Sequence, residues 1–369
     1  MDLSAEDSLR INVLLANKPQ AIRIHESSMT LYGLSGHEEV QVKLNPNCRD
    51  EQYLKRVREM LSGHVLGSPG GYPVYLQRWT RMGQMRDDNL DQLLLLGEPE
   101  AVVAVVCAPG ITDELARRAW WAMEDAENAR RMLMRDAVSE GDMGPVLAHY
   151  LVDYLPFETE IEQMMVTVSL VLKPGLISDE AKEDLWARAR RKPAYYVGFL
   201  SACPDDLPEQ KQASARYHQL QQPLSAIAAD NPVAALLLRV HSPAGQAFLD
   251  TVVRVLKKPG TQEMVTATLD NLALYFSGMR PEGRVDMTLG ELEQDAEAGR
   301  TEPAKAVEEV LQRCPDCAGE IQTMYLLSGL GYGVLRPVLR DTTAIGSLMR
   351  RKIEPVISPL LERIAQLQS

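Results

Sequence analysis

Two cysteines with the spacing of a redox motif, in the segment Cys314-Pro315-Asp316-Cys317, are the most chemically suggestive residues of the chain. A C-x-x-C pair at the start of a helix can lower the pKa of one thiol and alternate between a dithiol and a disulfide. The nearby carboxylates of Asp316 and Glu320 would raise the thiol pKa, and no thioredoxin-like strand precedes the motif. Two ligands are too few for a structural zinc site. Cys314 and Cys317 are therefore candidates for redox or persulfide chemistry, with a helix cap at Asp316 as the structural alternative.

Clusters of basic residues are the second candidate for function. Arginine beside aromatic residues can stack on nucleic-acid bases or insert into a groove of a protein partner, whereas most basic runs are solvated faces. The candidate binding patch consists of Arg78, Trp79, Arg81, Arg188, Arg190, Arg191, Arg350, Arg351 and Lys352.

The remaining motifs predict neither catalysis nor a bound group. The six histidines are scattered without metal-ligand spacing, and the segment Gly329-Leu330-Gly331-Tyr332-Gly333 resembles a helix end more than a dinucleotide loop. Acid, base, nucleophile and oxyanion donors do not occur together in any recognisable pattern. We therefore predict a protein that is not an enzyme and that has no cofactor and no metal.

A repeated phrase predicts how these residues are positioned: an aliphatic run, then Pro-Gly, then a Ser or Thr followed by acidic residues. The three copies carry Pro109-Gly110 with Thr112, Pro174-Gly175 with Ser178, and Pro259-Gly260 with Thr261. Pro and Gly end a helix, and the hydroxyl can cap the next one. Each copy therefore predicts an antiparallel helix pair, although the valine-rich runs 102–106 and 166–172 could also be strands. The apolar stripe from Leu115 to Leu133 predicts one long helix.

The N-terminal segment shows a different period. After a helical stretch at 5–17, apolar and polar residues alternate over 21–25, 29–32 and 40–44, as in half-buried strands. We expect a mainly α protein of stacked antiparallel helix pairs, a HEAT-like or irregular helical array, with a small N-terminal antiparallel β-sheet. The expected parts are a small α+β segment at 1–47, a helical region at 48–205 with two copies of the phrase, and a C-terminal helical region at 206–369.

Composition restricts the class of protein. The chain has 369 residues, 45% of them hydrophobic, which indicates a globular fold with a substantial core. The net charge of −12 argues against a general nucleic-acid binder, although a local basic face remains compatible with one. The acidic N-terminus lacks an apolar segment, no run is long enough to span a bilayer, and the five cysteines lack framework spacing. We expect a cytoplasmic protein without membrane contact.

Two stretches carry a family resemblance. The opening Met1-Asp2-Leu3-Ser4-Ala5-Glu6-Asp7-Ser8-Leu9-Arg10 and the block Trp120-Trp121-Ala122-Met123-Glu124-Asp125-Ala126-Glu127-Asn128-Ala129-Arg130-Arg131 resemble the DsrS family. These are cytoplasmic proteins encoded with dissimilatory sulfite reductase in sulfur-oxidising bacteria. The resemblance implies an accessory protein of sulfur-globule oxidation, with a role in controlling expression of the pathway. The family has no established catalytic motif, so no site residue is carried over.

Three functional hypotheses follow from these observations. The first is an accessory or regulatory protein of dissimilatory sulfur oxidation that binds protein partners through its helix faces. The second is thiol, persulfide or redox handling by Cys314 and Cys317. The third is RNA binding in post-transcriptional control, which the net charge disfavours. The identity of the partner and the oligomeric state stay open at this point.

Overall fold

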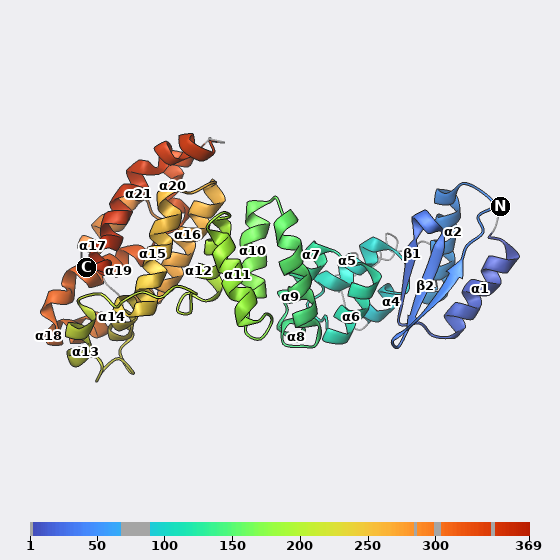
Figure 1. The fold of residues 1–369 in the computed structure, drawn as a ribbon, viewed down its shortest axis with the longest axis horizontal. Coiled ribbons are helices and arrows are strands. Elements are labelled where there is room, and N and C mark those ends of the chain that lie inside the picture. The colour runs from blue at the N-terminus through green and yellow to red at the C-terminus, as the bar shows by residue number, and fades with distance from the viewer. Residues whose placement is uncertain (1–2, 68–88, 284–285, 299–303, 341–343) are drawn as a thin grey trace. The chain divides into compact units, whose positions relative to one another are not determined.

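The computed structural model describes residues 3–67, 89–283, 286–298, 304–340 and 344–369. The chain divides into two compact units, Met1–Pro156 and Phe157–Ser369. The described residues form the predicted mainly α fold of packed helix pairs with a small N-terminal sheet (Figure 1).

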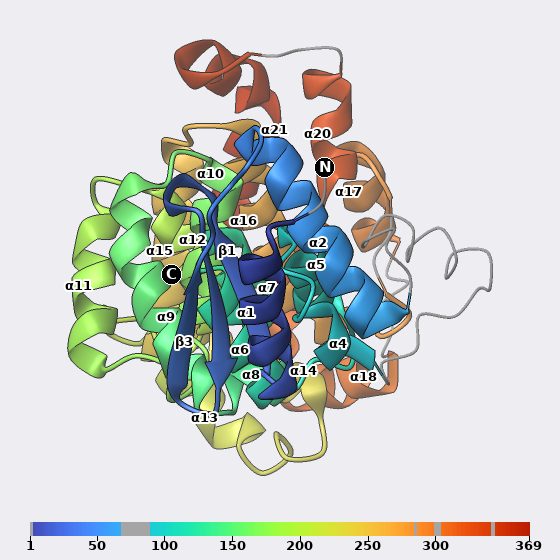
Figure 2. The ribbon, with the colours of Figure 1, turned by 90° about the vertical axis from the view of Figure 1, so that its right-hand side faces the viewer.

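The N-terminal part of the first unit is a three-stranded antiparallel sheet with two helices. The strands β1 (Ala21–His25), β2 (Thr30–Ser35) and β3 (Glu38–Lys43) pair in the order β1-β2-β3, as the alternating pattern predicts. Helices α1 (Ala5–Ala16) and α2 (Asp50–Leu66) lie with the sheet in Figure 2. Ile11 of α1, Leu31 of β2 and Tyr53 of α2 are fully buried in a shared core. This sheet is therefore covered by helices of its own unit.

The rest of the first unit is helical. Its elements are α4 (Leu90–Leu93), α5 (Pro99–Cys107), α6 (Asp113–Ala122), α7 (Ala126–Leu133), α8 (Asp136–Ser139) and α9 (Met143–Tyr154). The valine-rich run 102–106 lies in α5, so the helical interpretation of that run is confirmed. Thr112 caps α6 as predicted, since its hydroxyl accepts a hydrogen bond from the backbone N–H of Leu115.

The prediction of one long helix from Leu115 to Leu133 is wrong. Helix α6 ends before Met123, and α7 begins after Asp125, whose carboxylate accepts hydrogen bonds from the backbone N–H groups of Glu127 and Asn128. This capping offers the backbone an alternative to a continuing helix. The apolar spacing continues across the break, which is why periodicity alone concealed it.

The second unit contains only helices among its described elements. They are α10 (Ile161–Val171), α11 (Asp179–Ala189), α12 (Ala194–Ala202), α13 (Tyr217–Leu224), α14 (Pro232–His241), α15 (Pro243–Lys257), α16 (Gln262–Tyr275), α17 (Leu289–Glu297), α18 (Ala304–Arg313), α19 (Ala318–Ser328), α20 (Tyr332–Leu339) and α21 (Gly346–Gln368). Ser178 and Thr261 cap α11 and α16 through their hydroxyls, as the repeated phrase predicts. The run 166–172 lies in α10 and its C-cap, which again confirms a helix rather than a strand.

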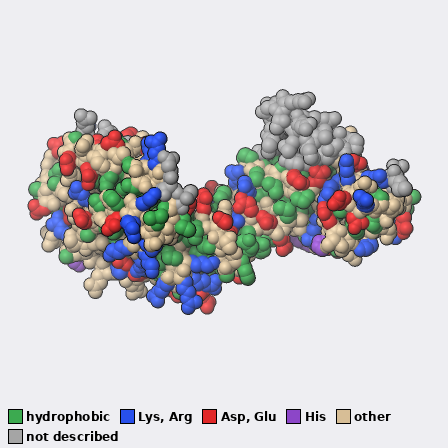
Figure 3. Space-filling model, turned by 90° about the horizontal axis from the view of Figure 1, so that it is seen from above, with side chains coloured by type: hydrophobic (Ala, Val, Ile, Leu, Met, Phe, Trp, Pro, Cys, Tyr) green, Lys and Arg blue, Asp and Glu red, His purple; other side chains and the backbone are tan. Residues whose placement is uncertain are grey.

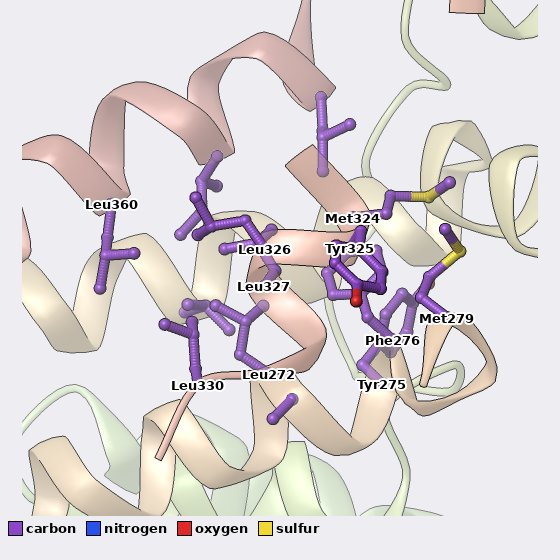
Figure 4. Packing of buried hydrophobic residues seen from close by; sticks show 14 of the residues in the cluster. Leu272, Tyr275, Phe276, Met279, Met324, Tyr325, Leu326, Leu327, Leu330 and Leu360 are labelled. Carbon is purple, nitrogen blue, oxygen red and sulfur yellow. The ribbon is translucent and has the colours of Figure 1, made fainter. Parts of the chain in front are cut away.

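The core of the second unit lies between α16, α19 and α21. Figure 4 shows Leu272 and Phe276 of α16 and its end packed near Met324 and Leu327 of α19. Each of these four side chains is fully buried. Burying a leucine or phenylalanine side chain contributes roughly 1.5–3 kcal/mol, so this packing is the main force that holds the unit together. It also fixes the ends of α15 and α21, which carry the candidate site.

Candidate functional site

The turn between α15 and α16 is the centre of the candidate site. Helix α15 ends at Lys257, and Lys258-Pro259-Gly260 leads to the capping residue Thr261. Both lysines are exposed, and Arg254 lies one turn earlier on α15. This third copy of the repeated phrase therefore presents basic side chains on the surface of the second unit.

A concave pocket of about 530 Å³ lies on one side of this turn, between α11, α12 and α15. Its cations are Arg190, Arg254 and Lys258. Arg254 is already neutralised, because its Nη2 donates hydrogen bonds to Glu209 at 2.8 Å and to Asp250 at 2.9 Å. The bond to Glu209 is the largest cause that raises the pKa of Arg254 above its usual range. Arg190 and Lys258 therefore supply the charge available to a ligand.

A second hollow of about 430 Å³ lies between the end of α15 and the start of α21. Lys257, Arg350 and Arg351 line it, together with Glu354. The first turns of α21 are anchored at the α15–α16 turn, because Arg350 Nη1 donates a hydrogen bond to the carbonyl oxygen of Pro259 at 3.3 Å. This anchoring brings two of the predicted basic clusters, 188–191 and 350–352, to opposite sides of one turn.

We call Arg190, Arg191, Lys257, Lys258, Arg350 and Arg351 the basic surface. Lys and Arg side chains gather on the face of the second unit that Figure 3 presents. None of the six forms an ion pair with any described residue, and five of them are exposed to solvent. Arginines elsewhere in the unit pair with carboxylates, among them Arg188, Arg216, Arg239, Arg254 and Arg280. The basic surface therefore carries uncompensated positive charge on a chain of net charge −12.

The structure places the other residues of the predicted patch differently. Arg78, Trp79 and Arg81 lie outside the described residues. Arg188 pairs with Asp184 within α11, and Lys352 is exposed beside Arg351. Two of the three predicted clusters thus meet at one place, and the third is not placed.

The aromatic residues beside Arg190 belong to the core. Tyr195 and Tyr196 are buried, and the ring of Trp186 packs edge-on against Tyr196 and Phe199 at centroid distances of 4.8 and 5.0 Å. Base stacking needs exposed ring faces, and these rings are occupied by one another. Positive charge, rather than exposed aromatic rings, is therefore the main feature that the basic surface presents.

The two cysteines of the C-x-x-C motif lie close together, and the environment of Cys317 makes its thiol a poor nucleophile. Their Sγ atoms are 2.8 Å apart, with Cys314 half-buried and Cys317 fully buried just before α19. Burial is the largest cause that raises the pKa of Cys317, and the neighbouring Cys314 and the Glu320 carboxylate raise it further. The thiol of Cys317 is therefore protonated at neutral pH, so the helix start does not activate it.

A buried polar network next to the cysteines was not predicted from the sequence. Arg216 donates hydrogen bonds to both carboxylate oxygens of Glu320, at 2.9 and 3.3 Å, and its Nη2 lies 4.0 Å from Cys317 Sγ. His241 is fully buried, with Nδ1 2.7 Å from Ser214 Oγ and Nε2 3.6 Å from Glu320 Oε1. Burial lowers the pKa of His241, so the ring is neutral and Arg216 is the cation that pairs with Glu320.

The side chains of this network are too buried to act on a substrate. Ser214 is buried together with His241, so its hydroxyl cannot reach a substrate in solvent. Within the described ranges, no three His, Cys, Asp or Glu residues are arranged to hold a metal ion. The residues of the network come from α14, α19 and the segment before α13, which no local motif could have linked. Only the polarity of an isolated histidine in an apolar helix hinted at it.

The comparisons with known proteins add no assignment. The chain matches no protein-family model, no curated protein and no solved structure. Among the described helices, none combines the length and the apolar character that crossing a bilayer requires.

Proposed function

We propose that this chain is a binding protein without catalytic activity, and that its basic surface docks onto an acidic patch of a protein partner. The observation that carries the proposal is a set of six basic side chains that have no carboxylate partner among the described residues. They lie at the ends of α11 and α15 and near the start of α21. Such a field attracts an oppositely charged partner and raises the association rate. The resemblance to the DsrS family supports an accessory or regulatory role in dissimilatory sulfur oxidation in the cytoplasm.

An acidic protein fits the basic surface better than RNA does. The net charge of −12 repels a long phosphate backbone beyond the basic surface itself. Tyr196 is buried and Trp186 packs edge-on against it, so little aromatic surface is left for stacking on bases. A protein partner can concentrate its negative charge on one limited area, whereas RNA carries negative charge along its whole backbone.

A pull-down from cells that oxidise reduced sulfur compounds tests the proposal. The bait is the full chain, the triple variant Lys257→Glu/Lys258→Glu/Arg351→Glu, and a control of equal charge change. The control variant is Lys18→Glu/Lys55→Glu/Lys305→Glu, at exposed lysines that form no ion pair with any residue in the described part of the chain. We expect the wild type and the control to recover the same partner, and the triple variant to lose it.

Each lost charge pair at an interface rim is worth about 0.2–1 kcal/mol, so three together lower the affinity roughly 3-fold to 150-fold. Added salt should weaken the complex in the same way. Recovery of no partner, or equal recovery by the triple variant, would contradict the proposal. Loss of the captured material after nuclease treatment would assign the basic surface to RNA instead.

A second candidate function is dithiol chemistry, which the 2.8 Å separation of the Cys314 and Cys317 Sγ atoms favours. An external disulfide could oxidise the pair, with each released thiol of that reagent taking up one proton and one electron. Mass spectrometry after exposure to disulfide and persulfide reagents tests this candidate. Two unmodified cysteines, together with a Cys314→Ser variant that is silent in cells, would remove it.

A further inference from the structure

A second concave region of the same unit carries the opposite charge. It is a groove of about 530 Å³ between α10, α12, α16 and the start of α20. We call it the acidic groove. The residues that line it are Glu162, Met165, Val166, Ser169, Val197, Gly198, Ser201, Gln262, Glu263, Thr266, Ala267, Asp270, Asn271 and Tyr332.

Two helical stripes form the walls of the acidic groove. On α16, Glu263, Ala267 and Asp270 follow at spacings of four and three, which places them on one face. On α10, the same spacings of four and three separate Glu162, Val166 and Ser169. Each wall therefore begins with a carboxylate near the helix start and continues with small or apolar side chains, and the α16 wall also carries Asp270.

The floor of the groove is apolar, and α10 and α12 pack closely together there. Gly198 of α12 faces α10 so closely that an added Cβ would lie 2.6 Å from Val168 Cβ and 2.8 Å from the carbonyl oxygen of Met165. The lack of a side chain at Gly198 lets α10 and α12 approach each other, and Met165 and Val197 cover the contact. The groove therefore combines apolar contact area with charge at its edges.

Its charge has one sign only. The lining contains three carboxylates, those of Glu162, Glu263 and Asp270, and no Lys, Arg or His. Glu162 and Glu263 are exposed and form no ion pair with any residue that the structure places. Glu162 lies on the α10 wall and Glu263 on the α16 wall. A ligand with cations along both of its edges would match these two carboxylates.

Large apolar side chains extend the groove on the surface. Leu274 is one turn beyond Asp270 on the same face of α16 and is 59% exposed. Tyr332 stands at the rim and is 51% exposed. Exposed leucine and tyrosine beside charged residues are typical of protein interfaces, where aromatic residues act as anchors. A small cation would leave both of them uncovered.

We propose that the acidic groove binds a basic amphipathic helix of a partner protein. The apolar face of that helix would lie on Met165, Ala267 and Leu274, and the Lys or Arg residues that flank this face would pair with Glu162 on one wall and Glu263 on the other. Two helical stripes on either side of an apolar floor suit helix-in-groove recognition. This site is separate from the basic surface, because a basic helix would be repelled there and an acidic partner would be repelled here.

Fluorescence anisotropy with a labelled synthetic peptide tests the inference. The probe is an amphipathic helix with leucines on one face and lysines on both flanks of that face, and the control peptide has glutamate in place of each lysine. The protein is the full chain, Glu162→Gln/Glu263→Gln, and the matched control Glu297→Gln/Glu308→Gln on α17 and α18. All four glutamates are exposed, so both double variants should fold normally.

We expect the lysine peptide to bind and the glutamate peptide not to bind. The groove variant should weaken binding roughly fivefold relative to wild type at low salt, and the control variant should leave it unchanged. Equal weakening by both variants would show non-specific attraction to an acidic protein and would overturn the inference. So would displacement of the peptide by spermidine at concentrations near the peptide's own dissociation constant, because the site would then recognise charge alone.

Discussion

Replacing Gly198 with alanine tests the packing that shapes the acidic groove. The substitution adds one methyl group between α12 and α10, 2.6 Å from Val168 Cβ, whereas ordinary contacts begin at 3.4 Å. One helix must therefore move by about 0.8 Å, the difference between these distances. A rotation of the Val168 side chain cannot relieve the clash, because the added Cβ would also lie 2.8 Å from the backbone oxygen of Met165. Overpacking of this kind costs roughly 1–3 kcal/mol.

A favourable effect opposes that cost. Alanine is a better helix former than glycine by about 1 kcal/mol in a helix interior, and it also restricts the unfolded chain. The expected net loss in the free energy of unfolding of the second unit is about 1–2 kcal/mol, because backbone atoms are among the contacts and cannot rotate away. For a unit of this size, that loss corresponds to a decrease in Tm of roughly 2–8 °C.

Urea and thermal unfolding measure the effect, with Gly319→Ala in α19 as the matched control. Gly319 is also helical, but nothing lies within 4 Å of an added Cβ, so alanine there should be neutral or stabilise the protein by up to about 1 kcal/mol. If Gly198→Ala were as stable as Gly319→Ala, α10 and α12 would be farther apart than described. The same variant should weaken binding of the basic peptide, because it displaces one wall of the groove.

Two further predictions concern buried charge in the second unit. Burial lowers the pKa of His241 below its usual 6.5. As the pH falls, His241 is therefore protonated in the unfolded chain at a higher pH than in the folded chain. This contribution to the free energy of unfolding should be fully present above about pH 6.5 and decrease as the pH falls below that value. Urea unfolding at about pH 7.5 and 5.5 should therefore show a smaller pH-dependent loss of stability in His241→Asn than in the wild type. Arg280 is buried over the ring of Tyr325 and bound to Asp295 at 2.8 Å, so Arg280→Ala should lower the free energy of unfolding by about 3–5 kcal/mol in the same assay. A loss below 1 kcal/mol would show that solvent replaces the guanidinium.

Local signals in the sequence predicted most of the elements. Pro-Gly followed by a hydroxyl residue located the starts of α6, α11 and α16, because chain termination and capping depend on a few neighbouring residues. The alternation over 21–44 located the sheet for the same reason. The break at Met123 to Asp125 was missed, since a capping aspartate in the middle of an apolar stripe resembles an ordinary polar position.

The sites depend on contacts between distant residues and were predicted only in part. The basic residues at 190 and 350 were recognised as clusters, but their meeting follows from the docking of α21 on the α15–α16 turn, through Arg350 and Pro259. The network of His241 and Glu320 joins helices without any shared motif. The acidic groove was missed, because it forms only where Glu162 of α10 comes close to Glu263 and Asp270 of α16, and no local pattern links the two helices.

The basic surface also permits a test that separates binding from structure. The helix dipole favours cations at a helix C-terminus, which accounts for Lys257 in the last turn of α15. It does not account for Arg351, which lies near the positive end of α21 and has no carboxylate partner within the part of the chain that the structure describes. Such uncompensated charges repel one another in the free protein and are retained at a small cost in stability.

We therefore expect Lys258→Gln/Arg351→Gln to leave the free energy of unfolding unchanged or raised by up to about 0.5 kcal/mol, while recovery of the acidic partner falls. Urea unfolding and the pull-down are measured on the same preparations. If the double variant instead lost more than about 1 kcal/mol, these two side chains would be holding the α15–α16 turn in place, and their lack of partners would no longer indicate a binding surface.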